Sequence, residues 1–184
     1  MAKRHLVKQL GSSSLNYEDL TTILAQIEGC MNSRPLTALN DDPHDLRPLT
    51  PAQLAINRSL QSLPDPDLRS VPVNRMDRYQ RIQEKVQSFW YRWRTEYLNE
   101  LNQQMKNSPI KVDIPIGSIV VLKDELLPPV QWPLARVMRL HPGKDDTTRV
   151  VTLRTASGVL QRPTSKICIL PWDLEKTSES SGAE

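Results

Sequence analysis

The sequence predicts an α+β fold, with helices first and a small barrel of β-strands last. Apolar side chains in residues 75–107 recur at spacings of three and four, the period of an amphipathic helix. Residues 110–172 instead fall into short runs rich in Val, Ile and Leu, each closed by turn residues. Runs of strand length that are punctuated in this way favour a small antiparallel barrel or curled sheet. We therefore expect a mixed chain that ends in a five-stranded barrel.

The first predicted unit is a helical hairpin over residues 1–34. It consists of a short basic helix over Ala2–Leu10 and an amphipathic helix over Tyr17–Asn32. The second helix follows Asn16, a favourable N-cap residue, and it ends before Pro35, because proline disfavours the helical region for the residue that precedes it. A hairpin of this size cannot bury its own apolar stripe. We expect it to need a partner surface.

Residues 35–74 are acidic, irregular and dotted with proline, which favours a linker. One short helix is predicted within it, near residues 51–57. The sequence Thr50-Pro51-Ala52-Gln53 combines an N-cap residue, a proline at the first helical position and a glutamine that can complete a capping box.

The long helix over residues 75–107 is the most regular element of the sequence. Its apolar stripe is rich in aromatic residues, and it predicts packing against the barrel, the N-terminal hairpin or a second copy of the chain. The stripe consists of Tyr79, Ile82, Val86, Phe89 or Trp90, Trp93, Tyr97, Leu101 and Met105. The aromatic cluster at 89–97 is interpreted as a packing seam. Residues 173–184 have too few apolar side chains to bury and are expected to be disordered.

Composition narrows the function classes. The net charge is +3, from 24 Lys and Arg against 21 Asp and Glu, which by itself says little about a polyanionic partner. Cys30 and Cys168 lie far apart, which favours reduced thiols in an intracellular protein. The three histidines are scattered, so we expect no metal site and no cofactor. No apolar run reaches the roughly 18 residues of a membrane span, and no motif indicates a small-molecule substrate.

The predicted barrel is the most basic part of the chain. Residues 110–172 contain nine Lys or Arg against five Asp or Glu, a local net charge of +4. Strand alternation separates an apolar face from a face that carries arginines. Lys and Arg on such a face can bind phosphates without reading the base sequence. The candidate contacts are Arg136, Arg139, Lys144, Arg149, Arg154, Arg162 and Lys166.

Several short motifs resemble parts of Pao/BEL-type LTR retrotransposon polyproteins. Asn32-Ser33-Arg34-Pro35-Leu36-Thr37 and Leu49-Thr50-Pro51 are similar to the end of the integrase catalytic core. Others resemble the uncharacterised domain that closes these polyproteins, namely Trp132-Pro133-Leu134-Ala135-Arg136-Val137, Pro142-Gly143-Lys144-Asp145, Arg149-Val150-Val151, Arg162-Pro163 and Leu170-Pro171. The chain departs from that pattern at Gly117-Ser118, where the family usually has Gly-Asp.

The resemblance implies a fold and a function. Integrases of this kind use an Asp-Asp-Glu triad that holds two divalent metals on an RNase H-like fold. The resemblance places the catalytic glutamate upstream of the stretch that matches Ala2–Leu10. We therefore expect residues 1–34 to be a truncated remnant of that core, and the chain not to be an enzyme. Integrase C-terminal domains are small barrels related to SH3 and chromo folds that hold DNA through basic faces, which implies the same for residues 110–172.

The hypothesis from the sequence is sequence-independent binding of DNA, or of RNA, by the basic barrel, in the nucleus if the protein is active. An ordinary solvated face explains the same charges about as well. A rival hypothesis is a protein-interaction module that uses the barrel, or that self-associates through residues 75–107. A third is a vestigial product of a decayed element. Trp132 could stack on a ligand, but it is interpreted as a core residue that caps the barrel.

Overall fold

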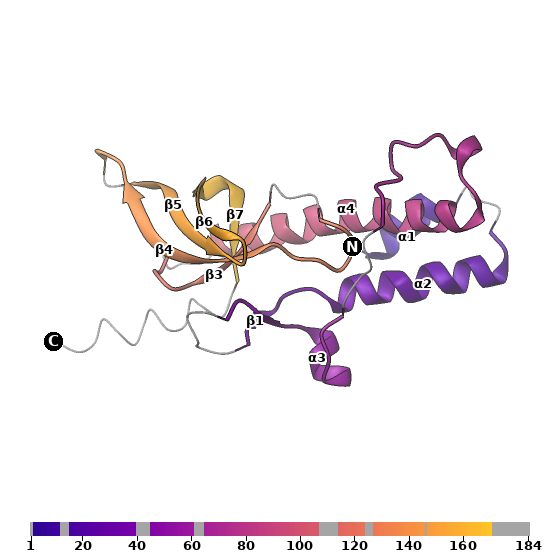
Figure 1. The fold of residues 1–184 in the computed structure, drawn as a ribbon, viewed down its shortest axis with the longest axis horizontal. Helices are drawn as coiled ribbons and strands as arrows, with labels where there is room; N and C mark the ends of the chain where they lie inside the picture. Colours follow the sequence, from indigo (N-terminus) through magenta and orange to yellow (C-terminus); the bar gives the residue numbers. More distant parts are fainter. Residues whose placement is uncertain are drawn as a thin grey trace.

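The computed structural model describes residues 2–11, 15–39, 45–60, 65–106, 114–123, 127–145 and 147–170 (Figure 1). The helices are α1 (Ala2–Leu10), α2 (Tyr17–Asn32), α3 (Pro51–Ile56) and α4 (Arg78–Lys106). The strands are β1 (Thr37–Ala38), β2 (Pro48–Leu49), β3 (Ile119–Leu122), β4 (Leu134–Pro142), β5 (Thr148–Thr155), β6 (Gly158–Pro163) and β7 (Ile167–Ile169). Short 3₁₀ turns lie at Val73–Arg75 and Thr164–Lys166. The α+β class is confirmed, and the predicted tail at 173–184 lies outside the described residues.

The helix boundaries follow from local capping. The side chain of Asn16 accepts a hydrogen bond from the amide of Asp19 at 2.8 Å, which satisfies one of the free donors at the start of α2. Thr50 caps α3 in the same way, accepting from the amide of Gln53 at 3.2 Å, with proline at the first helical position. The predicted linker also holds a small antiparallel pair of strands, β1 and β2, which the sequence analysis does not foresee.

The partner surface for the N-terminal hairpin is the first half of α4. Figure 1 shows α2 running alongside α4, with α1 beside them and the sheet at the other end of α4. Ile23, Ile27 and Cys30 of α2 form one apolar cluster with α4, and all three are at most 3% exposed. The α4 members of this cluster are Ile82, Val86, Phe89, Trp90 and Trp93. The stripe of the hairpin is therefore buried within the chain itself.

Strands β3 to β7 form one antiparallel sheet in the order β6-β5-β4-β3-β7. Strands β6 and β7 are its edges, and among the described residues no ladder joins them, so the sheet is not a closed barrel. It is the curled sheet that the strand pattern also favours, because inward residues from β3, β4, β5 and β7 share one apolar cluster. That cluster consists of Val120, Leu122, Ala135, Val137, Val151, Leu153, Ile167 and Ile169.

The second half of α4 covers part of the outer side of this sheet. Leu98 and Leu101 of α4 pack with Ile119 and Val121 of β3 and with Cys168 of β7. One continuous helix thus closes two apolar cores, one with the N-terminal helices and one with the sheet. Strand β3 faces a core on both sides, which explains why all four of its residues are buried.

Trp132 joins the two cores. Its ring makes edge-on contacts with Trp90, Trp93 and Tyr97 of α4, with centroids 5.0, 6.1 and 5.8 Å apart. Its Nε1 donates a hydrogen bond to Ser33 Oγ at 3.1 Å, just beyond α2. Trp132 is therefore a packing residue, as predicted, but it lies between the sheet and the helices and does not cap a barrel end. The cluster at 89–97 is the packing seam that the sequence predicts.

Candidate nucleic-acid interface

The five strands of the large sheet carry five arginines and no Asp or Glu. These are Arg136 and Arg139 on β4, Arg149 and Arg154 on β5, and Arg162 on β6. A run of strands with charges of one sign presents a field that attracts anions, since no carboxylate within the strands offsets it.

The strand register sorts these arginines onto different faces. Arg136 pairs directly with Arg154, so their side chains share one face of the sheet. A β-bulge between Val137 and Arg139 shifts the register and pairs Arg139 with Thr152. Thr152 lies between two buried residues of β5 and points away from the core, so the bulge returns Arg139 to the face of Arg154.

We call this surface the outer face. It consists of Arg136, Arg139 and His141 of β4, Thr152 and Arg154 of β5, and Val159 and Gln161 of β6. Its extension onto β3 and β7 lies under α4. The part on β4 to β6 stays open to solvent, with Arg139 and Val159 both exposed.

Arg136 uses its guanidinium inside the molecule. Nη1 donates to the carbonyl of Gly117 at 2.7 Å, and Nη2 donates to the carbonyl of Asp45 at 3.0 Å. The side chain thereby ties the turn before β3 and the segment before β2 to the edge of the outer face. Its charge contributes to the field of this face, but its hydrogen-bonding role is structural.

Arg149 lies at the far end of β5 and forms a bidentate ion pair with Asp145 of the preceding turn. Nη1 donates to Oδ1 at 2.9 Å and Nη2 to Oδ2 at 2.6 Å. This hydrogen bonding lowers the pKa of the Asp145 carboxyl. Gly143 lies close to the pair: a Cβ there would lie 2.8 Å from Asp145 Oδ1 and 3.1 Å from Arg149 Nη1, so a side chain at this position would have to shift these flexible groups. Asp145 therefore offsets the charge that the sequence analysis assigns to DNA binding.

The remaining candidates lie apart from the outer face. Arg162 pairs with Val151, a buried core residue, and so belongs to the opposite side of the sheet. Lys144 is exposed in the turn between β4 and β5, and Lys166 is exposed in the 3₁₀ turn before β7. The structure thus gathers three of the seven predicted residues on one face.

Arg139 and Arg154, both on the outer face, form no ion pair with any residue that the structure describes. Near them, His141 Nε2 lies 2.7 Å from Thr152 Oγ1. This face carries no Trp, Tyr or Phe, and its one aromatic ring is the imidazole of His141, so it offers phosphate contacts and little surface on which a base could stack.

Residues 77–170 match the family of unknown function DUF5641. The chain belongs to this family. The DUF5641 match covers just over half of the chain, from the residue before α4 to the residue after β7. It includes the outer face and excludes α1 and α2, whose side chains complete the core against α4. No curated protein and no solved structure matches the chain.

Two other features are absent from the described part of the chain. It contains no group of three or more His, Cys, Asp or Glu side chains that could hold a metal ion. None of its helices combines the length and the apolar character that crossing a membrane requires.

Proposed function

We propose that this DUF5641 protein binds the nucleic-acid backbone, independently of sequence, through the outer face of β4 to β6. The observation that carries the proposal is the pair Arg139 and Arg154, which share one open sheet face that has no carboxylate. Phosphates supply the counter-charge that such a face lacks. His141 carries the only aromatic ring among the described residues of this face, which favours backbone contacts over base contacts. We assign the chain a binding role and no catalytic one.

We further propose that the chain derives from the integrase region of a Pao/BEL-type retrotransposon. The DUF5641 match supports this origin, since the motifs of residues 132–171 resemble the domain that closes those polyproteins. The motifs at 32–37 and 49–51 resemble the end of the integrase core. In such a protein, a backbone-binding face would hold element or target DNA.

Self-association through α4 has less support than nucleic-acid binding. The apolar stripe that would mediate it is occupied within the chain, with Val86, Phe89 and Trp93 at most 5% exposed. A second copy would have to displace α1 and α2, or the sheet, to reach this stripe.

The test is a salt titration with the full chain. Binding to a fluorescent DNA duplex of about 20 base pairs is followed by anisotropy, and an RNA duplex is measured in parallel. The salt concentration is varied from about 25 to about 200 mM, because the release of counterions from phosphates makes the affinity depend on salt. The double variant Arg139→Gln with Arg154→Gln should lose two phosphate contacts. The slope of log K against log salt should then become shallower by about 1.8, at about 0.9 for each contact.

The matched control is Arg149→Gln with Arg162→Gln, which removes the same charge from strands β5 and β6 of the same sheet but not from the outer face. Its slope should stay close to that of the wild type. Equal losses in both variants would show a net-charge effect and refute the assignment of the face. No binding of the wild type at 25 mM salt would refute the function.

A further inference from the structure

A cleft runs along α4, and none of the arginines of the outer face lines it, so the inference drawn from it is independent of the proposed function. It consists of two adjoining hollows of about 140 and 350 Å³ that share Asp65 and Pro129. The larger hollow lies between α2 and α4, and Cys30, Val86 and Val130 form apolar walls of it. Its volume is within the range of small-ligand sites, about 300–1,000 Å³. We call the two hollows together the α4 cleft.

One wall of the α4 cleft contains Gly29, and no close packing within the chain requires glycine at this position. Gly29 lies in the interior of α2, where glycine costs about 0.5–1 kcal/mol relative to alanine. A Cβ at this position would meet no atom within 4 Å. The missing side chain therefore serves no close packing within the chain, and it leaves the helix backbone open to the larger hollow.

The opposite wall is strained. Val130 has φ +74°, a left-handed conformation that is rare for a β-branched residue. Strain of this kind costs about 1–3 kcal/mol and is concentrated at binding sites and other functional positions. Here it places Val130 against the helical core and along the larger hollow.

The segment that carries Asp65 is fixed against α4. Gln87 of α4 accepts a hydrogen bond from the amide of Leu68 at 2.9 Å and donates one to the carbonyl of Pro66 at 2.9 Å. Both are backbone contacts of the residues that follow Asp65. The backbone next to Asp65 is thus fixed against α4, and Asp65 itself lies where the two hollows meet.

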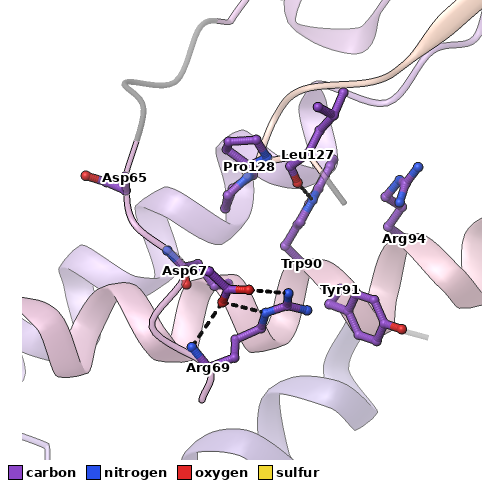
Figure 2. Close-up of a pocket in the computed structure, with 10 residues that line it drawn as sticks. Asp65, Asp67, Arg69, Trp90, Tyr91, Arg94, Leu127 and Pro128 are labelled. Atoms are coloured by element: carbon purple, nitrogen blue, oxygen red, sulfur yellow. Dashed lines mark hydrogen bonds and ion pairs between the residues drawn. The ribbon is translucent and has the colours of Figure 1, made fainter. Parts of the chain in front are cut away.

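Asp65 is the one charged side chain among the described residues that line the larger hollow. The smaller hollow also contains Asp67, Arg69 and Arg94. Figure 2 shows Asp67 paired with Arg69, at 2.9 and 2.6 Å, and the guanidinium of Arg69 lies 4.8 Å from the centre of the Tyr91 ring. Arg94 lies at the opposite end of this hollow from Asp65 and donates to the carbonyl of Leu122 at 2.9 Å. Asp65 forms no hydrogen bond or ion pair with the residues that the structure describes.

We propose that the α4 cleft binds a lysine or arginine side chain presented by an extended segment of a partner protein. The aliphatic stem of such a side chain suits the apolar walls, and its cationic head suits Asp65. Tyr79, on the rim of the larger hollow and 59% exposed, offers an aromatic face for the same cation. The open backbone at Gly29 leaves room for the main chain of the partner.

The test uses two peptides that differ in one ammonium group, acetyl-Leu-Lys-Leu-amide and its norleucine analogue. Each peptide is titrated into the isotope-labelled full chain up to about 10 mM. This concentration is needed because a few contacts give a dissociation constant in the millimolar range. The amide signal of Gly29 is followed by NMR. The lysine peptide should bind at least about fivefold more tightly than the analogue, as expected for one half-exposed charge contact. Asp65→Asn should abolish this preference.

The matched control is Glu28→Gln, which removes an exposed carboxylate from α2 beside Gly29 without touching the cleft. It should keep the preference for lysine. Saturable shifts with neither peptide would overturn the site. Equal affinities would overturn the cationic occupant, and a preference that survives Asp65→Asn would overturn the role of that carboxylate.

Discussion

Replacing Trp132 with alanine should destabilise the helical core and the sheet together. Its ring contacts three aromatic residues of α4, and its Nε1 donates to Ser33 Oγ at 3.1 Å. Trp132 packs against both apolar clusters that α4 closes. The residue therefore links the helical core directly to the sheet core.

The expected size of the effect follows from these contacts. Removal of a fully buried tryptophan side chain costs about 3–5 kcal/mol, and the whole stability of a domain is about 5–15 kcal/mol. Trp132 is partly buried, so its removal should cost about 3 kcal/mol, the lower end of that range. Trp132→Phe keeps most of the ring packing but loses the hydrogen bond, which is worth about 0.5–1.5 kcal/mol, together with the second ring. It should cost about 1–3 kcal/mol, between the wild type and the alanine variant.

The assay is urea unfolding followed by circular dichroism for the helices and by NMR methyl signals of valines in β4 and β5 for the sheet. Both probes should report the same lowered midpoint for Trp132→Ala. Tyr17→Ala, which removes a ring that is 83% exposed, is the control and should change stability by less than about 0.5 kcal/mol. A loss below about 1 kcal/mol for Trp132→Ala, or a sheet midpoint that stays at the wild-type value, would refute the linking role.

Three further predictions concern individual side chains. Burial raises the pKa of Cys30 to about 12 and that of Cys168 to about 11. Neither thiol should therefore react with a disulfide reagent at pH 8 until the chain unfolds. Rapid reaction of the native protein would contradict this prediction. The hydrogen bond from Arg69 lowers the pKa of Asp67 to about 2, so the pair stabilises the fold above about pH 4 and the contribution disappears as the pH falls toward 2. Because Asp67 is 58% exposed, the pair should contribute less than about 1 kcal/mol to the free energy of unfolding. Arg69→Gln should therefore reduce the fall in stability between about pH 4 and pH 2, measured by urea unfolding at each pH. An unchanged pH dependence would contradict the role of the pair. Gly158 has φ +138°, so Gly158→Ala should destabilise the β5–β6 turn by about 1–2 kcal/mol in urea unfolding, and a neutral result would show that the turn can relax.

Local chemistry made much of the fold predictable. Helix signals depend on residues that are close in the sequence. Examples are the N-caps at Asn16 and Thr50 and the 3.6-residue period of α4, and the structure has helices at all three places. The pairing of β1 with β2 was not predictable in this way, because it joins residues that lie across a loop and have no alternating pattern. The partner of the hairpin stripe also depends on tertiary packing, although the complementary stripe on α4 was visible in the sequence.

The candidate residues were predicted from residue type, and the structure shows how they are divided between the faces and turns of the sheet. Alternation alone could not assign Arg139 to a face, because the bulge after Val137 changes the register. The sequence also could not reveal that Arg136 holds two backbone carbonyls. The pairing of Arg149 with Asp145 had a signal, a spacing of four residues around a turn, but that spacing also fits unpaired charges.

Helix α4 fixes the distance between the N-terminal helices and the sheet. Its 29 residues span about 44 Å at 1.5 Å per residue, and it is packed at both ends. The N-terminal helices and the sheet therefore cannot swing like domains on a tether, because any reorientation would have to break the helix or open one of its cores. We therefore expect α1, α2 and the sheet to move together with α4, so that a rotation of the N-terminal helices also rotates the outer face.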